Sequence, residues 1–358
     1  MVSMNNFRRR IAAFGMVCLA TIGTPLLAQE KTDFKVAWSI YVGWMPWGYA
    51  EKAGIVDKWA DKYGITIEVT QFNDYVESIN QYTAGAYDAV TVTNMDALSI
   101  PAVGGVDTTA VIIGDFSAGN DAVILKDKTT LQDIAGQSVN LVQFSVSHYL
   151  LARALESVGL AEKDVTAVNT SDPDMVAAFQ TPEVMAMVTW NPMVSEIAKL
   201  PGATSVFDSS MIPGEIIDMM VVNTDVLAAN PDFGKALAGI WYETMAIMVA
   251  DTPEGAAART AMGLASGTDL AGFEAQMADT KLFADPAEAV AFTTSPDLKT
   301  TMDRVRGFLF NAGLFAPGSA SADVVGIEFP DGSVLGDAGF VKLRFTDAYM
   351  AAAAAGGL

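Results

Sequence analysis

The sequence contains almost none of the residues on which metal sites and nucleophilic enzymes depend. Among its 358 residues there is one cysteine, Cys18, and one histidine, His148. A zinc site with nitrogen and sulfur ligands needs several such side chains. A Ser–His–Asp triad would have to pair His148 with Ser147, and neighbours in sequence on a helix do not face each other. We therefore expect no metal, no catalytic residue and no enzymatic activity, and we expect His148 to pack or cap at a helix start.

Nucleotide motifs, basic residues and long apolar runs are also missing. No Walker lysine motif or dinucleotide glycine fingerprint follows an expected strand, so we expect no cofactor. With 21 Lys and Arg against 42 Asp and Glu, the formal charge is −21. This charge repels phosphate backbones and excludes nucleic acid as a partner. No internal apolar run approaches the roughly 20 residues that cross a bilayer. The chain is 51% hydrophobic, and it is long enough to bury one large core or two ordinary ones.

The first 28 residues have the features of an export signal. Three arginines at 8–10 precede the apolar stretch 11–20, and small residues lead to Ala28. We interpret residues 1–28 as a signal peptide rather than a buried helix, and ordinary secretion as more consistent than a twin-arginine signal. Val17 lacks the small side chain expected before a lipidated cysteine, so we expect Cys18 to be removed with the signal. The predicted location is the periplasm.

After this segment, short β-rich runs alternate with helical stretches. This alternation predicts an α/β fold with parallel strands and crossover helices. Beyond Asn223 the pattern is almost wholly helical until a hairpin expected near 329–336, where Pro-Asp-Gly is a turn signal. The expected strands are 35–40, 65–71, 89–93, 109–113, 122–125, 139–142, 185–189 and 219–222.

Several strings resemble one family of transport proteins. Residues 145–160 and Trp190-Asn191-Pro192 are similar to elements of the nitrate, sulfonate and taurine group of ABC-transporter substrate-binding proteins. The strings 44–49, 73–82 and 93–96 look like the branch encoded beside urea carboxylase-type enzymes. Members of that branch are described as urea transporters, and some of the neighbouring carboxylases act on guanidine.

The resemblance implies a two-lobed periplasmic binding protein of type II. Each lobe would be a mainly parallel sheet flanked by helices, with hinge crossings near 115–121 and 218–223. One lobe would comprise 31–117 with 223–358, and the other 118–222. The resemblance also implies a small-molecule ligand and an ABC membrane permease as partners, and we expect a monomer.

The loops at the strand ends should form the ligand site of such a fold. They contain no Lys or Arg but several acids and tryptophans. Uncompensated carboxylates repel sulfonate and nitrate, so the ligand should be neutral or cationic. Guanidinium is planar, cationic and donor-only, which suits forked carboxylate contacts and an aromatic face. The predicted ligand-binding residues are Trp44, Asp74, Asn94, Asp96, Asp115, Ser145, Ser147, Trp190 and Asp218.

Each of these residues has an alternative structural role. Asp74 precedes Glu77 in a capping-box pattern, and Asn94 and Asp96 suit a helix cap and first turn. Asp115 and Asp218 could be solvated residues of the crossings, and the tryptophans could pack in the core. Urea or another neutral amide remains the alternative ligand, with the serine hydroxyls donating to its carbonyl. An exported enzyme on the same fold is the alternative of a different class.

Overall fold

The computed structural model describes residues 31–315 and 318–358. The expected signal peptide, 1–28, lies outside the described residues. The segment Lys31–Leu358 forms one compact unit that contains two β-sheets. Among the described residues, no helix has the length and apolarity to cross a membrane.

The larger sheet has nine strands and draws on both ends of the described chain. In spatial order the main path is β13 (Val334–Leu335), β12 (Gly326–Glu328), β14 (Val341–Phe345), β4 (Thr108–Ser117), β10 (Ile217–Asn223), β3 (Ala89–Thr93), β1 (Asp33–Ser39) and β2 (Thr66–Phe72). One edge of β4 pairs with β14 near its start and with β11 (Thr280–Leu282) near its end, and the other edge of β4 pairs with β10.

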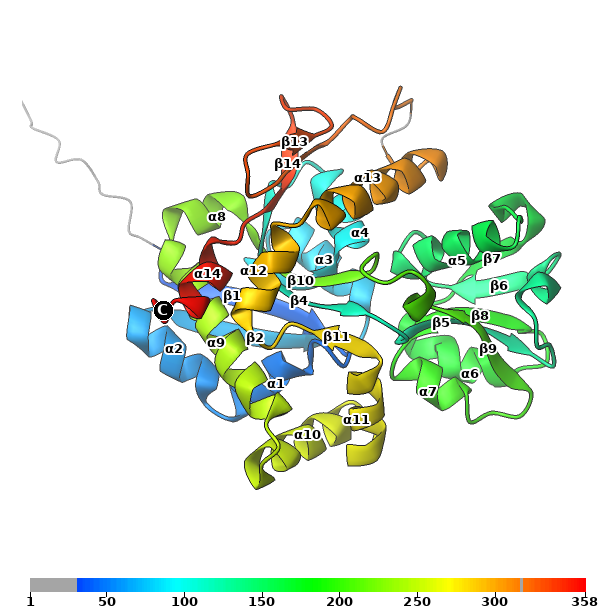
Figure 1. Cartoon of the computed structure of the whole chain (residues 1–358), viewed down its shortest axis with the longest axis horizontal. Helices are drawn as coiled ribbons and strands as arrows, with labels where there is room; N and C mark the ends of the chain where they lie inside the picture. Colours follow the sequence, from blue (N-terminus) through cyan, green and yellow to red (C-terminus); the bar gives the residue numbers. More distant parts are fainter. Residues whose placement is uncertain (1–30, 316–317) are drawn as a thin grey trace, which may run out of the picture. The chain divides into compact units, whose positions relative to one another are not determined.

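The smaller sheet has five strands, all from the middle of the chain, and lies beside the larger one (Figure 1). Its order is β7 (Thr166–Asn169), β6 (Ser138–Leu141), β8 (Ala186–Trp190), β5 (Asp121–Lys126) and β9 (Ala203–Asp208). β7 and β9 were not expected from the sequence. Both are partly exposed and carry polar residues, so neither has the continuous apolar run by which the other strands were recognised.

The α/β fold expected from the alternating pattern is confirmed, but both sheets are mixed rather than mainly parallel. β1 runs parallel to β2 and β3, whereas β10 runs antiparallel to β3 and β4. The reason is the path of the chain, because β4 leaves the larger sheet and β10 returns to it. β4 runs toward the smaller sheet and the neighbouring β10 runs away from it, so the two strands are antiparallel.

The chain crosses between the sheets twice. It leaves after Ser117 and enters the smaller sheet at Asp121, and it returns between Asp208 and Ile217. The sequence analysis placed the return crossing at 218–223 and residues 118–222 in one lobe. The structure corrects this boundary, because Asp218 and the four residues after it pair with β3 and β4 of the larger sheet. The apolar run after Asp218 is a central strand that is buried on both faces.

Helices flank both sheets (Figure 1). On the larger sheet, α3 (Tyr75–Thr83) contacts β1 and β3, and α4 (Asn94–Ala97) contacts β3 and β10. Two later helices, α12 (Pro286–Thr293) and α14 (Ala348–Ala354), contact β4. The smaller sheet is contacted by α5 (Val146–Ser157), α6 (Met175–Gln180) and α7 (Met193–Ile197). The expected hairpin is confirmed as β12 paired antiparallel with β13. The helices are α1 (Met45–Lys52), α2 (Ile55–Tyr63), α3 (Tyr75–Thr83), α4 (Asn94–Ala97), α5 (Val146–Ser157), α6 (Met175–Gln180), α7 (Met193–Ile197), α8 (Thr224–Ala229), α9 (Pro231–Val249), α10 (Pro253–Ala265), α11 (Leu270–Ala278), α12 (Pro286–Thr293), α13 (Pro296–Asn311) and α14 (Ala348–Ala354).

Candidate ligand-binding site

A small cavity is lined by strand ends and helix starts from both sheets. Its empty space is about 260 Å³, its open mouth included. Because this figure includes open solvent, the enclosed space is smaller still, and only a very small solute would fit between the side chains as they lie here. The lining residues are Tyr41, Trp44, Tyr75, Thr93, Asp121, Val146, Trp190, Ile216 and Asp218.

Two carboxyls meet at this cavity because of strand register. Asp218 of β10 is the ladder partner of Asp115 of β4 and of Thr93 of β3. Side chains directly opposite each other in a ladder lie on the same face of the sheet. Both carboxyls are buried, with Asp115 0% and Asp218 3% exposed. The hydroxyl of Tyr41 donates to Oδ1 of Asp115 at 3.2 Å.

Burial raises the pKa values of these carboxyls. The pKa of Asp115 is about 7 and that of Asp121 is about 7, each chiefly because burial disfavours the charged form. The pKa of Asp218 is raised well above its usual value by burial and by the charges of Asp115 and Asp121. Hydrogen bonding between the two carboxyls acts on them in opposite directions, because it lowers the pKa of Asp115 and raises that of Asp218. Among the described lining residues there is no Lys or Arg to neutralise this charge.

Aromatic rings form the rest of the wall. Consecutive ring centroids lie 5.3 Å apart for Tyr41 and Trp44, 5.4 Å for Trp44 and Tyr75, and 5.6 Å for Tyr75 and Trp190. Burial raises the pKa values of Tyr41 and Tyr75 well above the usual range, so both hydroxyls stay protonated donors. The face of an aromatic ring attracts a cation. Carboxyls and rings together therefore favour a positively charged ligand.

Asp96 holds three lining residues in place. Its Oδ2 accepts hydrogen bonds from the Tyr75 hydroxyl at 2.8 Å, the Thr93 hydroxyl at 2.9 Å and the Val146 backbone N–H at 3.2 Å. Burial raises the pKa of Asp96 to about 6. Its other oxygen, Oδ1, has no donor among the described residues. Asp96 thus connects β3 and α3 to the start of α5, which follows the smaller sheet.

The other predicted polar residues lie next to the cavity rather than in its lining. Asp74 caps α3 by accepting from the Glu77 N–H at 2.8 Å, and its second oxygen accepts from the Ser171 hydroxyl at 2.7 Å. Asn94 accepts from the Ile217 N–H and donates to the Glu215 carbonyl, both at 3.1 Å. Asp74 therefore has the capping role, and Asn94 fixes the return crossing to α4.

The two serines flank a lining residue. Ser145 caps α5 by accepting from the Ser147 N–H at 3.2 Å. Ser147 is buried, and its hydroxyl has no partner among the described residues. His148 is packed as expected, because its Nδ1 accepts from the Phe144 N–H at 3.2 Å and its Nε2 lies 3.3 Å from a Glu162 oxygen. Both ring nitrogens are therefore engaged away from the cavity.

Comparison with known proteins places this fold in a family. The model of the NMT1-like family matches residues 28–265. The chain belongs to that family. Among curated proteins with similar sequences, the taurine-binding periplasmic protein of Escherichia coli (strain K12) is 23% identical over 195 residues, or 53% of this chain and 59% of that protein. The chain thus spans less than two thirds of the length of the curated relatives it matches.

Solved structures share the fold of this NMT1-like chain. The alkanesulfonate-binding protein of Xanthomonas axonopodis pv. citri, bound to MOPS, has a TM-score of 0.67 at 15% identity and covers 81% of this chain and 96% of its own. The nitrate-binding protein of Synechocystis PCC 6803 has a TM-score of 0.57 at 13% identity, covering 86% and 96%. At these identities the likeness establishes the two-sheet fold of a periplasmic binding protein.

Sequence reasoning missed six of the nine lining residues. Asp121 begins a strand of the smaller sheet, and no sequence pattern shows that it lies at the same cavity as Asp218. Tyr75 reads as the first residue of a helix, and its inward hydroxyl has no sequence signal. The missed residues are Tyr41, Tyr75, Thr93, Asp121, Val146 and Ile216.

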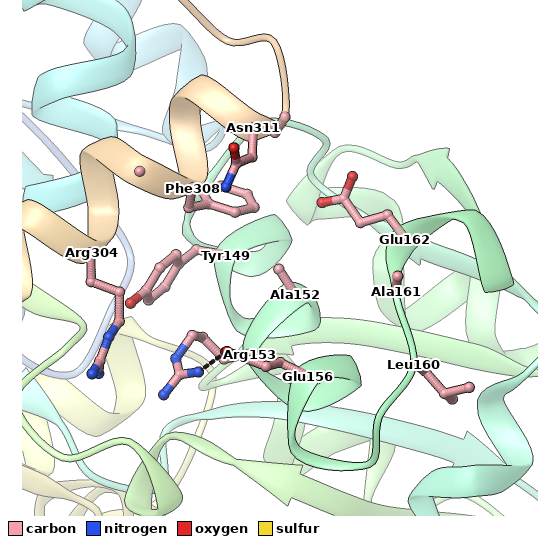
Figure 2. A pocket seen from close by; sticks show the side chains of 12 residues that line it. Tyr149, Ala152, Arg153, Glu156, Leu160, Ala161, Glu162, Arg304, Phe308 and Asn311 are labelled. Carbon is pink, nitrogen blue, oxygen red and sulfur yellow. Dashed lines mark hydrogen bonds and ion pairs between the residues drawn. The ribbon is translucent and has the colours of Figure 1, made fainter. Parts of the chain in front are cut away.

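A larger groove lies between α5 and α13, with about 1010 Å³ of empty space. Figure 2 shows Tyr149, Arg153 and Arg304 on one side of it and Glu162 on the other. Glu215 accepts from Arg153 Nε at 2.8 Å, from the Tyr149 hydroxyl at 2.5 Å and from Arg304. Glu215 therefore already neutralises charge in this groove, and helix surfaces rather than strand ends line it. We regard it as a structural contact.

No metal centre accompanies the acids. Within residues 31–315 and 318–358, no group of three His, Cys, Asp or Glu side chains has a geometry that could hold a metal ion.

Proposed function

We propose that this chain is the periplasmic solute-binding component of an ABC importer and that its ligand is a small organic cation, most specifically guanidinium. The importer role is supported by the shared fold and by the binding activities that the names of its relatives state. The membrane permease would be its partner, and we expect the protein to act as a monomer that binds its solute without transforming it.

One observation carries the choice of ligand. The cavity brings together buried carboxyls and aromatic rings, and its described lining contains no basic side chain. Taurine and nitrate are the ligands in the names of two relatives, and no basic side chain of the described lining would balance the negative charge of their sulfonate or nitrate group. Guanidinium carries its charge in a planar fork of donors, which can engage Oδ2 of Asp115 and a neighbouring carboxylate together. An uncompensated buried carboxylate is costly, and such a cation removes the cost.

The two sheets define the lobes that we expect to close on the solute. One lobe would hold the larger sheet and the other the smaller sheet, joined by the crossings at 118–120 and 209–216. Because lining residues come from both sheets, a bound solute gains contacts from both only when the lobes are closed. Ligand should therefore shift the population toward the closed state.

Urea is the second candidate, and one observation favours it. The indole N–H of Trp44, a lining residue, has no acceptor among the described residues. The carbonyl of urea could accept from it, while guanidinium offers no acceptor. Urea carries no charge, however, so the carboxyls of Asp115 and Asp218 would stay protonated when it binds. The charge of the ligand is thus the property to test.

The test is thermal unfolding with a panel of salts at low millimolar concentration. Guanidinium chloride should raise the melting temperature relative to matched sodium chloride, urea should do so more weakly, and taurine and nitrate should have no effect. A ligand at a hundredfold excess over its dissociation constant stabilises by about 2.7 kcal/mol. Asp115→Asn and Asp218→Asn should weaken the response to guanidinium, whereas Asp74→Asn, whose amide oxygen can still cap α3, should retain it.

Two results would contradict the proposal. Urea stabilising more than guanidinium would identify a neutral ligand, and a full guanidinium response in both Asn variants would remove the carboxyls from the site. Mass spectrometry of solute released from the purified protein identifies the ligand directly. Recovery of carbon-13-labelled guanidinium unchanged after incubation would exclude the enzymatic alternative.

A further inference from the structure

Three carboxyls around the cavity come from three different strands. Asp115 lies on β4, Asp218 on β10 and Asp121 on β5, and each is 3% exposed or less. The other titratable groups that face them are acids or phenols. These are Tyr41 after β1, Tyr75 at the start of α3 and Asp96 in α4. Among the described neighbours of these carboxyls, no side chain supplies a positive charge.

Asp115 and Asp218 are placed to share a proton. The two residues are ladder partners, and both carboxyls are buried on the same face of the sheet. Oδ2 of Asp115 has no hydrogen-bond donor among the described residues. Two buried carboxyls that face each other disfavour ionising together, and they can bond to each other only when one of them carries a proton. The pair therefore holds a positive particle, the proton, at the place where a cationic solute would bind.

We propose that solute capture by this chain is an exchange of a cation for a proton at the Asp115–Asp218 pair. This proposal rests on the proposed function and goes beyond it by specifying what leaves when the solute enters. The carboxyl O–H bond breaks, the proton passes to solvent, and the two carboxylates accept N–H bonds from the cation. One positive charge enters and one leaves, so the net charge of the site does not change.

Strand geometry explains why this pair, rather than Asp96 or Asp121, makes the exchange. Asp96 already accepts three hydrogen bonds. Hydrogen bonding with Ser117 lowers the pKa of Asp121 and so favours its charged form. The carboxyl of Asp115 accepts from the Tyr41 hydroxyl at Oδ1, and its Oδ2 has no donor among the described residues. Removing the shared proton thus creates two acceptors with few donors, which a donor-only cation satisfies.

The test is isothermal titration of guanidinium chloride into the full protein, in phosphate and in Tris at the same pH and ionic strength. The difference in apparent enthalpy between the two buffers gives the number of protons released. We expect guanidinium to release protons at pH 6, where the pair is protonated, and fewer at pH 9. Affinity should rise with pH by up to about tenfold per pH unit for each proton released, and it should level off once the pair has lost its proton.

Variants separate the shared proton from the general acidity of the site. Asp218→Asn removes one acid of the pair and places an amide that can donate to Asp115, so proton release and the pH slope should fall below those of the parent protein even where weak binding persists. Asp74→Asn serves as the matched control and should keep both. Should Asp218→Asn bind too weakly for calorimetry, carbon-13 NMR of labelled Asp carboxyls reports the pair without ligand. One carboxyl that titrates near neutral pH in the parent protein should then be absent from the variant.

The outcomes distinguish this proposal from the function on which it rests. Guanidinium binding with no proton release and constant affinity from pH 6 to pH 9 overturns the exchange and leaves the proposed function intact. Absence of guanidinium binding throughout that range overturns the guanidinium assignment, and the exchange with it. An unchanged proton release in Asp218→Asn also overturns the exchange, because another group would then be the source.

Discussion

The carboxylate of Asp96 accepts a hydrogen bond from the backbone N–H of Val146 at 3.2 Å. Asp96 belongs to α4 beside the larger sheet, and Val146 begins α5 after the smaller sheet. The bond therefore spans the two sheets directly beside the cavity that Val146 lines. A charged acceptor at a helix start also interacts favourably with the helix dipole. Asp96 is thus placed to hold the protein in the conformation seen here.

Two substitutions of Asp96 should distinguish how much its charge and its hydrogen bonds each contribute to the free energy of unfolding. Asp96→Asn retains an oxygen where Oδ2 accepts its three bonds, so we expect a loss of stability below about 1 kcal/mol. Asp96→Ala leaves the Tyr75 hydroxyl and Val146 N–H without an acceptor and should cost on the order of 2 to 4 kcal/mol. Differential scanning calorimetry measures both. Equal losses in the two variants would show that charge, not hydrogen bonding, is what Asp96 contributes.

The stability of the ligand-free protein should fall as pH rises from about 4.5 to 7.5. Burial raises the pKa of Asp115 and Asp121 to about 7, so the folded state binds protons that the unfolded state, with aspartate pKa values near 3.9, has released. Each extra proton held by the folded state costs about 1.4 kcal/mol of stability per pH unit across that window. A melting temperature that rises over this range would contradict the assignment.

The double variant Asp115→Asn, Asp218→Asn should flatten this pH profile. Asp172, whose pKa burial also raises to about 7, is the internal comparison. It lies outside the cavity lining and accepts from the Tyr75 N–H at 3.3 Å. The residual slope in the double variant should therefore match the contributions of Asp96, Asp121 and Asp172. Calorimetric scans at fixed ionic strength provide the measurement.

Gly43 should be essential for the position of Asp115. A Cβ added at Gly43 would collide with Oδ2 of Asp115 and approach the Tyr41 ring to 2.8 Å. We expect Gly43→Ala to displace the carboxyl and weaken guanidinium binding by at least about tenfold, or 1.4 kcal/mol. Gly307→Ala is the control, because a Cβ there meets no atom within 4 Å and α13 should gain about 0.5 to 1 kcal/mol. Undiminished affinity in Gly43→Ala would place the ligand elsewhere.

Glu215 should contribute to stability through the return crossing. Its carboxylate forms ion pairs with Arg153 on α5 and with Arg304 on α13. Both arginine side chains are partly exposed, so solvent weakens the two ion pairs. We expect Glu215→Ala to cost about 2 to 3 kcal/mol of unfolding free energy. Glu156→Ala removes the exposed partner of the same arginine and should change stability by less than about 0.5 kcal/mol. Similar losses in the two variants would show that the buried carboxylate has no special role.

The sequence predicted the fold well where apolar runs are continuous. β3 was expected at 89–93 and is found there, and β8, expected at 185–189, is found at Ala186–Trp190. The mixed strand directions were not predictable, because run length does not report direction. The return crossing was placed too late for a related reason: the apolar run after Asp218 resembles any buried strand, and only its pairing with β3 shows to which sheet it belongs.

Three of the predicted residues line the cavity, and a fourth adjoins it. Trp44, Trp190 and Asp218 were chosen because they lie in or beside the loops at the ends of expected strands. Asp115 pairs with Asp218 next to the cavity. Asp74, Asn94 and Ser145 were chosen by the same rule but make local hydrogen bonds instead. Whether a polar residue at a strand end turns toward its own backbone or toward a cavity depends on distant partners such as Ser171, which lies 97 residues from Asp74.

The burial of the acidic pair also has a kinetic consequence. With Asp115 0% and Asp218 3% exposed, solvent does not reach these side chains in the conformation described here. A solute bound to them would leave only after the residues that line the cavity, Trp44 and Trp190 among them, have moved apart. The dissociation rate would then depend on how often the protein opens with the solute in place. Residence time should accordingly be longest for the solutes that hold the two sheets together most strongly.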